Sequence, residues 1–243
     1  MSNDEQFRDR IAFPETRWSR IISLQGGAGQ RDTEEAVLAD LCQDYWQPVY
    51  VFIRRRGYSP EEAEDATQDF FVELLSRESF AKADPKRGRL RTFLLSILNG
   101  FLAQRARNGS RLKRGGGRQL ISLDVPEAEL QLAPFLANLA PQETVFDRVW
   151  AKGVFLRAKQ MLCEEYHGDP DVYREFIGQL GLPDEKAPLP SPAAQSSAKR
   201  VALYRFRLRF RNILEAILRE TVASAEDLRD ELKYLAEMSA SID

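Results

Sequence analysis

Apolar residues recur every three or four positions along most of this chain, and this spacing constrains the fold more than any other feature. Side chains at these separations share one face of an α-helix, so each such segment is predicted to be an amphipathic helix. The helices are predicted over residues 34–56, 59–76, 90–107, 143–166, 171–180, 197–222 and 225–238. Residues 204–211 also alternate as a strand would, but their neighbours are helical and no second strand is available for pairing. We therefore predict an all-α protein.

The second predicted helix has the clearest start signal. Ser59 and Glu62 form a capping box, in which the serine hydroxyl and the glutamate carboxylate each accept from a free backbone amide of the other. Pro60 suits the first helical position, and Gly57 is placed to end the preceding helix. Later in the chain, four prolines between 183 and 192 exclude a helix there.

Length and composition exclude several classes of protein. A chain of 243 residues exceeds the usual size of one domain, so two modules are expected. One histidine and two distant cysteines give no metal-ligand spacing, and no glycine-rich phosphate loop or nucleophile elbow occurs. We therefore expect no metal, no cofactor and no enzymatic activity. The charged N-terminus and the lack of long apolar runs favour a cytoplasmic protein without a membrane segment.

Charge is unevenly distributed, although 35 basic residues nearly balance 37 acidic ones. Residues 85–123 carry ten basic and no acidic residues, and residues 186–214 carry seven basic and none acidic. Such clusters are typical of surfaces that bind the phosphates of nucleic acids. The acidic remainder would repel DNA and could meet a basic protein partner. For either basic block taken alone, a solvated helical face is the alternative.

Three runs of sequence carry a family resemblance: YWQPVY at 45–50, RRRGYSPEEAEDATQDFF at 54–71, and GRLRTFLL at 88–95 followed by Asn99. They resemble region two of bacterial sigma-70 family initiation factors of the extracytoplasmic-function type. The runs at 13–18, 113–117 and 220–222 look like one subgroup of these factors.

The resemblance implies two helical modules joined by a flexible linker. Residues 34–114 would form a sigma region 2 bundle, and residues 142–222 a divergent helix-turn-helix module like sigma region 4. Residues 1–33 would be an N-terminal extension, 115–141 the linker and 223–243 a C-terminal helix.

By this resemblance, the acidic second helix would bind the clamp helices of the largest RNA polymerase subunit. The residues implied are Glu64, Asp65, Gln68, Asp69, Phe70 and Phe71. The two phenylalanines also lie on the apolar stripe of this helix. An ordinary solvated acidic face is the alternative.

The following loop and helix would hold the non-template strand of the -10 element. Opening a duplex unstacks a base, and aromatic stacking, pocket hydrogen bonds and phosphate contacts offset that cost. The residues implied are Lys86, Arg87, Arg89, Arg91, Phe93, Asn99, Arg105, Arg107, Arg111, Lys113 and Arg114. Phe93 also falls on the apolar stripe of its helix, so a core position is its alternative.

Residues 197–207 resemble a recognition helix that reads the -35 element in the major groove. The residues implied are Lys199, Arg200, Tyr204, Arg205 and Arg207. The prolines at 188–192 depart from the family pattern, which has a short helix and a glycine turn there. Binding to phosphates without reading sequence is therefore the alternative for this helix.

We thus expect a sigma factor that binds RNA polymerase core and promoter DNA, with an anti-sigma factor as a further candidate partner. The alternative is a sigma-derived regulator that binds DNA or polymerase and no longer initiates. A helical nuclease or hydrolase has little support, because no paired carboxylates or nucleophile–base set emerges.

Overall fold

The computed structural model describes residues 31–74, 89–108, 125–180, 197–222 and 224–239, and every regular element in these ranges is a helix. The helices are α2 (Arg31–Arg54), α3 (Pro60–Leu74), α5 (Leu90–Asn108), α6 (Val125–Leu136), α7 (Gln142–Glu165), α8 (Pro170–Ile177), α9 (Ser197–Arg219) and α10 (Ala225–Ser239). The predicted all-α fold is confirmed. Residues 204–211 lie inside α9, where Leu203, Phe206 and Phe210 are buried at helical spacing.

The predicted start of α3 is confirmed in atomic detail. The Ser59 hydroxyl accepts from the Glu62 amide at 3.2 Å, and a Glu62 carboxylate oxygen accepts from the Ser59 amide at 2.9 Å. Gly57 has a φ of 92°, the left-handed conformation that lets the chain turn between α2 and α3.

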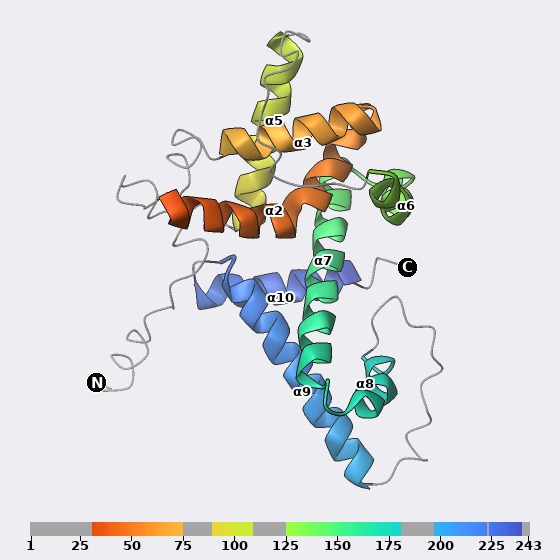
Figure 1. Cartoon of the computed structure of the whole chain (residues 1–243). Coiled ribbons are helices and arrows are strands. Elements are labelled where there is room, and N and C mark those ends of the chain that lie inside the picture. Colours follow the sequence, from red (N-terminus) through yellow and green to blue (C-terminus); the bar gives the residue numbers. More distant parts are fainter. Residues whose placement is uncertain (1–30, 75–88, 109–124, 181–196, 223, 240–243) are drawn as a thin grey trace, which may run out of the picture.

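The long helix α7 joins the two halves of the molecule (Figure 1). It packs against α2 at one end and against α9 further along, and α10 packs on both α7 and α9. Phe52 of α2 and Phe146 of α7 meet edge to face with ring centroids 6.2 Å apart. The sequence predicts a module boundary at residue 142, where α7 begins. Helix α7 packs against helices that come before and after this boundary in the chain.

Helix α6 forms within the segment expected to be linker. Glu129 of α6 accepts two hydrogen bonds from Arg54, at 2.7 and 3.0 Å, and one from the Tyr50 hydroxyl at 2.7 Å. Leu132 and Phe135 of α6 are buried. The end of α6 is capped by Arg55, whose guanidinium donates to the backbone carbonyls of Phe135, Leu136, Asn138 and Ala140. These tertiary contacts hold a helix whose apolar pattern is sparse in the sequence.

None of the helices in the described part of the chain combines the length and hydropathy needed to cross a lipid bilayer. Within the same ranges, no group of three or more His, Cys, Asp and Glu side chains is placed to hold a metal ion.

Candidate functional site

The exposed face of α3 is acidic. Asp65 and Asp69 are exposed, and Glu64 and Gln68 are half-buried beside them. Partial burial, together with the charges of Asp65 and Glu61, raises the pKa of Glu64. The Gln68 side-chain amide donates to Glu64 at 3.5 Å. Four of the six residues implied for polymerase binding are therefore brought together on one accessible surface.

Phe70 and Phe71 do not belong to that surface. Both side chains are completely buried, with their ring centroids 5.4 Å apart. Phe70 also meets Phe101 of α5 at 5.7 Å. Their expected contact with a partner is corrected here: the two rings hold α3 on the bundle, and burial leaves no aromatic area for docking.

The expected contact of Arg91 with DNA is also corrected; this residue lies at the start of α5. Its side chain is 8% exposed and lies between acidic groups of two other helices. Its guanidinium donates to Glu231 of α10 at 2.6 and 3.2 Å and to Asp147 of α7 at 2.7 Å. A DNA phosphate cannot reach Arg91 in this arrangement.

Aromatic rings complete the Arg91 cluster. The guanidinium carbon lies 4.1 Å from the ring centroid of Tyr234 and 5.1 Å from that of Trp150. The Tyr234 hydroxyl donates to Asp147 at 2.5 Å. Burial alone would lower the pKa of Arg91, but hydrogen bonding to Glu231 and the charges of Glu231 and Asp147 raise it. Arg91 is therefore held by hydrogen bonds to acidic groups of two other helices and by contacts with two aromatic rings.

Arg89 lies at the edge of the same cluster. Its side chain is 24% exposed and donates toward Glu231 at 3.1 Å and Asp230 at 3.5 Å. The backbone amide of Leu90 donates to the Thr221 carbonyl at 3.3 Å. The beginning of the expected DNA-binding helix is thus joined to the C-terminal part of the chain.

The other end of α5 projects from the bundle (Figure 1). Arg105 pairs with Asp69 of α3 at 2.6 Å, and Arg107 is exposed. Asn99 donates to the Leu95 carbonyl at 3.1 Å and accepts from Arg56. Phe93 is half-buried against the core, as its alternative interpretation expected. Lys86, Arg87, Arg111, Lys113 and Arg114 lie outside the described residues.

The candidate recognition helix α9 presents part of its expected set to solvent. Arg200, Tyr204 and Arg205 are exposed, Tyr204 by 66%. Lys199 pairs with Glu175 of α8 at 2.8 Å, and Arg207 donates to the Gln179 carbonyl at 2.8 Å. The proline-rich segment before α9 lies outside the described residues.

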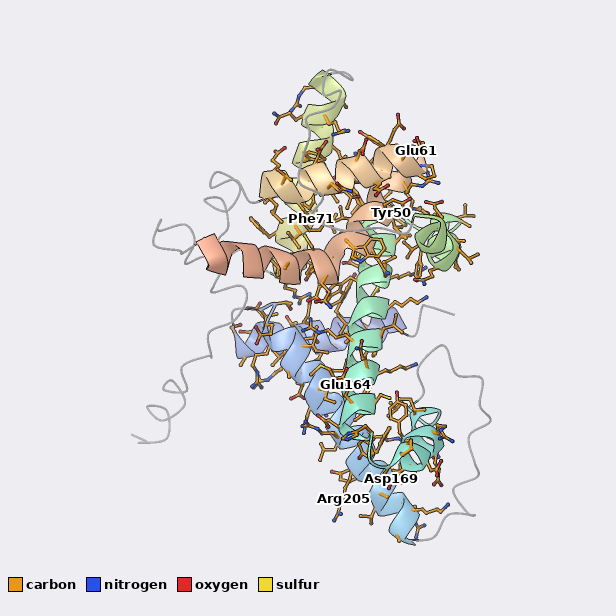
Figure 2. The ribbon with its side chains drawn as sticks, viewed as in Figure 1. Tyr50, Glu61, Phe71, Glu164, Asp169 and Arg205 are labelled. Atoms are coloured by element: carbon orange, nitrogen blue, oxygen red, sulfur yellow. The ribbon has the colours of Figure 1, made fainter. Side chains whose placement is uncertain are left out.

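The two exposed surfaces are far apart. Figure 2 shows Glu61 on α3 and Arg205 on α9 toward opposite ends of the molecule.

Residues 39–112 match the family model for sigma-70 region 2. The match supports a sigma-70 family sigma factor. It begins within α2 and includes α3 and α5, so both the acidic surface and the basic end of α5 fall inside the matched residues. Helices α6 to α10 lie outside it. No curated protein and no solved structure gives a significant match.

Proposed function

We propose that this protein is a sigma factor of the extracytoplasmic-function type. It binds RNA polymerase core, directs it to promoters and helps to open the DNA at the -10 element, without catalysis of its own. The observation that carries the proposal is the sigma-70 region 2 match over residues 39–112. Its proposed partners, RNA polymerase and promoter DNA, imply that it acts in the cytoplasm.

The α3 surface is the proposed contact with core polymerase. Glu64, Asp65, Gln68 and Asp69 supply acidic and amide groups on one accessible face. Opposite charge across an interface speeds encounter and excludes wrong partners. A basic helical surface of the polymerase is the matching partner.

The basic groups around α5 are the proposed contact with the opened -10 strand. Arg107 is exposed, and Arg105 forms an ion pair with a half-exposed Asp69. Surface ion pairs of this kind contribute little stability, so a phosphate can compete for the guanidinium. Lys86, Arg87, Arg111, Lys113 and Arg114 belong to the same proposed contact through their sequence positions.

Helix α9 is the proposed contact with upstream promoter DNA. Arg200, Tyr204 and Arg205 are exposed together near its N-terminal end, where a recognition helix meets bases. Two roles are open to this helix: recognition of the -35 bases in the major groove, or binding to DNA phosphates without sequence recognition. An anti-sigma factor is a further proposed partner, by the family resemblance alone.

The alternative is a sigma-derived regulator that no longer initiates. The burial of Arg91 favours it, because one expected DNA-binding group is occupied within the protein.

The proposal is tested by retention of genomic DNA fragments in heparin-resistant complexes with core polymerase from the source bacterium. We expect discrete fragments to be retained only when core and this protein are both present. Binding to core without any retained fragment would favour the regulator. No binding to core would contradict both.

A further inference from the structure

Helices α2, α7 and α9 enclose a pocket with a volume of about 220 Å³. Its α2 wall lies inside residues 39–112, and its α7 and α9 walls lie outside them. The volume is below the roughly 300–1,000 Å³ of pockets that hold drug-sized ligands, so an occupant would be small. None of the described residues proposed to contact polymerase or DNA lines this pocket.

Two residues of the lining account for the space between the helices. Gly153 lies inside α7, where glycine is less favourable than alanine, and a Cβ at this position would point into open space. Pro48 lies inside α2, and a proline inside a helix bends it. Helix α2 changes direction along its length (Figure 1). The missing side chain and the bend therefore keep this part of the α2–α7 contact open.

Much of the pocket lining is aromatic or branched aliphatic. It includes Trp46, Trp150, Val154, Leu156 and Ile217. Leu156 is 47% exposed, so part of this apolar surface can be reached from solvent. Aromatic side chains favour a flat aromatic partner, which they contact by stacking or edge to face. The lining therefore suits a ligand with an aromatic ring system.

Among the described residues that line the pocket, Arg157 and Asp44 carry charge, and they form an ion pair. Arg157 Nη1 donates to both carboxylate oxygens of Asp44, at 2.8 and 2.9 Å. Within the described part of the chain, the Nε and Nη2 groups of Arg157 make no hydrogen bond. The Arg157 side chain is 37% exposed, so a ligand can reach these two donors.

The Arg91 cluster of the same protein shows how two carboxylates share one arginine. Arg91 donates through Nη1 to Asp147, and through Nε and Nη2 to Glu231. Arg157 has the first kind of contact, with Asp44, and keeps its Nε–Nη2 edge open. A ligand carboxylate on that edge would form the bidentate pair that guanidinium groups favour.

We propose that this pocket binds a small aromatic carboxylic acid. The ring system lies beside Trp46 and Trp150, and the carboxylate accepts hydrogen bonds from Nε and Nη2 of Arg157. The occupant contacts α2, α7 and α9 at once, so its binding stabilises their packing by mass action. Neither polymerase nor DNA takes part in this binding, so the site stands or falls separately from the proposed function.

Isothermal titration calorimetry of the full chain with three bicyclic probes tests the class of ligand. The probes are 2-naphthoate, the neutral 2-naphthamide and the cationic 2-naphthylmethylammonium. We expect one 2-naphthoate to bind per chain, at least about tenfold more tightly than either other probe, because only the acid forms charge-assisted hydrogen bonds with Arg157. Equal affinity for the three probes, tighter binding of the cation, or no binding of 2-naphthoate at millimolar concentration would each overturn the proposal.

A matched pair of leucine substitutions locates the bound probe. Gly153→Leu places a side chain in the pocket. The control is Gly100→Leu, because a Cβ at Gly100 of α5 also points into open space and Gly100 lies outside the pocket. We expect Gly153→Leu to weaken 2-naphthoate binding by at least about tenfold and Gly100→Leu to leave it unchanged. Equal affinities of the two variants would place the probe elsewhere and contradict the proposed site.

Arg157→Gln tests the guanidinium without filling the pocket. We expect this variant to bind 2-naphthoate only as tightly as 2-naphthamide, while its affinity for 2-naphthamide stays that of the wild type. Arg174→Gln is the control, since Arg174 of α8 is 73% exposed and lies outside the pocket. A preference for the acid that survives Arg157→Gln would overturn the proposal. If circular dichroism shows that Gly153→Leu is unfolded, this second pair of variants carries the test.

Discussion

Arg91 and Glu231 are charged residues on the apolar faces of their helices. Glu231 follows Leu228 by three positions and precedes Leu235 by four, and both leucines are buried. The spacing alone places this carboxylate in the core. Its partner could not be predicted, because Arg91 lies 140 positions earlier and any buried cation would satisfy the same carboxylate.

Removing Arg91 should destabilise the fold strongly. Arg91→Ala leaves Glu231 and Asp147 buried without their main cation, and breaking a buried ion pair from one side costs about 3–5 kcal/mol. Urea unfolding followed by circular dichroism measures the loss. Arg107→Ala, at an exposed position of the same helix, should change stability by less than about 0.5 kcal/mol. If both variants lose an equally small amount of unfolding free energy, the account of Arg91 as the centre of a buried charged cluster is contradicted.

Phe70 offers a sharp test of core against surface. Phe70→Ala should lower the free energy of unfolding by about 3–5 kcal/mol, because the ring is fully buried. Val72→Ala is the control, since Val72 is 50% exposed on the same helix. The sequence already placed Phe70 on an apolar stripe, whereas the family resemblance placed it in an interface. A Phe70→Ala protein with unchanged urea midpoint and lost core binding would restore the interface assignment.

At the scale of elements, amphipathic periodicity predicted α2, α3, α5 and α7 to α10 with ends within a few residues. The capping box at Ser59 and Glu62 and the glycine at position 57 predicted the turn between α2 and α3. Helix α6 was missed because its apolar pattern is sparse and Pro134 lies inside it, and a proline inside a helix removes a backbone hydrogen bond. Its stability comes from Tyr50 and Arg54, which no local pattern reveals.

The docking of α6 should depend on Glu129 and on pH. Hydrogen bonds from Arg54 lower the pKa of Glu129, partial burial opposes that shift, and the Tyr50 hydroxyl adds to it. A depressed folded-state pKa stabilises the protein above the ordinary value of 4.5, and this stabilisation is lost as pH falls through the folded-state pKa. Glu129→Gln should therefore cost about 1 kcal/mol at neutral pH, after allowance for solvent screening.

Urea unfolding of wild type and Glu129→Gln across pH 3 to 7 is the measurement. The difference between the two proteins should shrink as the pH falls below about 4.5. A difference independent of pH would mean that the carboxylate charge does not hold α6.

The α3 surface should bind core polymerase through its carboxylates. Glu64→Ala with Asp65→Ala should weaken binding to core by about tenfold or more, equivalent to about 1.4 kcal/mol, and leave the urea midpoint nearly unchanged. The control is Glu61→Ala, an exposed acid on the same helix outside the proposed contact. Titration of labelled core gives both affinities. Equal weakening by the control would reduce the contact to general electrostatic attraction.

At the scale of the whole molecule, the two exposed charged surfaces lie well apart. The acidic α3 surface and the exposed arginines of α9 lie toward opposite ends (Figure 2). Helix α7 and the Arg91 cluster connect these ends through one continuous core. The two modules and the linker were predicted from chain length and family resemblance, and they stay a prediction. An amphipathic stripe shows that a helix is buried and does not show which neighbour covers it, so the contacts of α7 with helices on both sides were not predictable.

In vitro transcription tests the central claim most directly. Core polymerase from the source bacterium, this protein and genomic DNA are combined, and the 5′ ends of the transcripts are mapped. A sigma factor predicts discrete start sites that require the protein and share upstream sequence at a fixed spacing. The same pattern of transcripts with core alone, or no transcripts from a mixture in which core binding is demonstrated, would contradict the account.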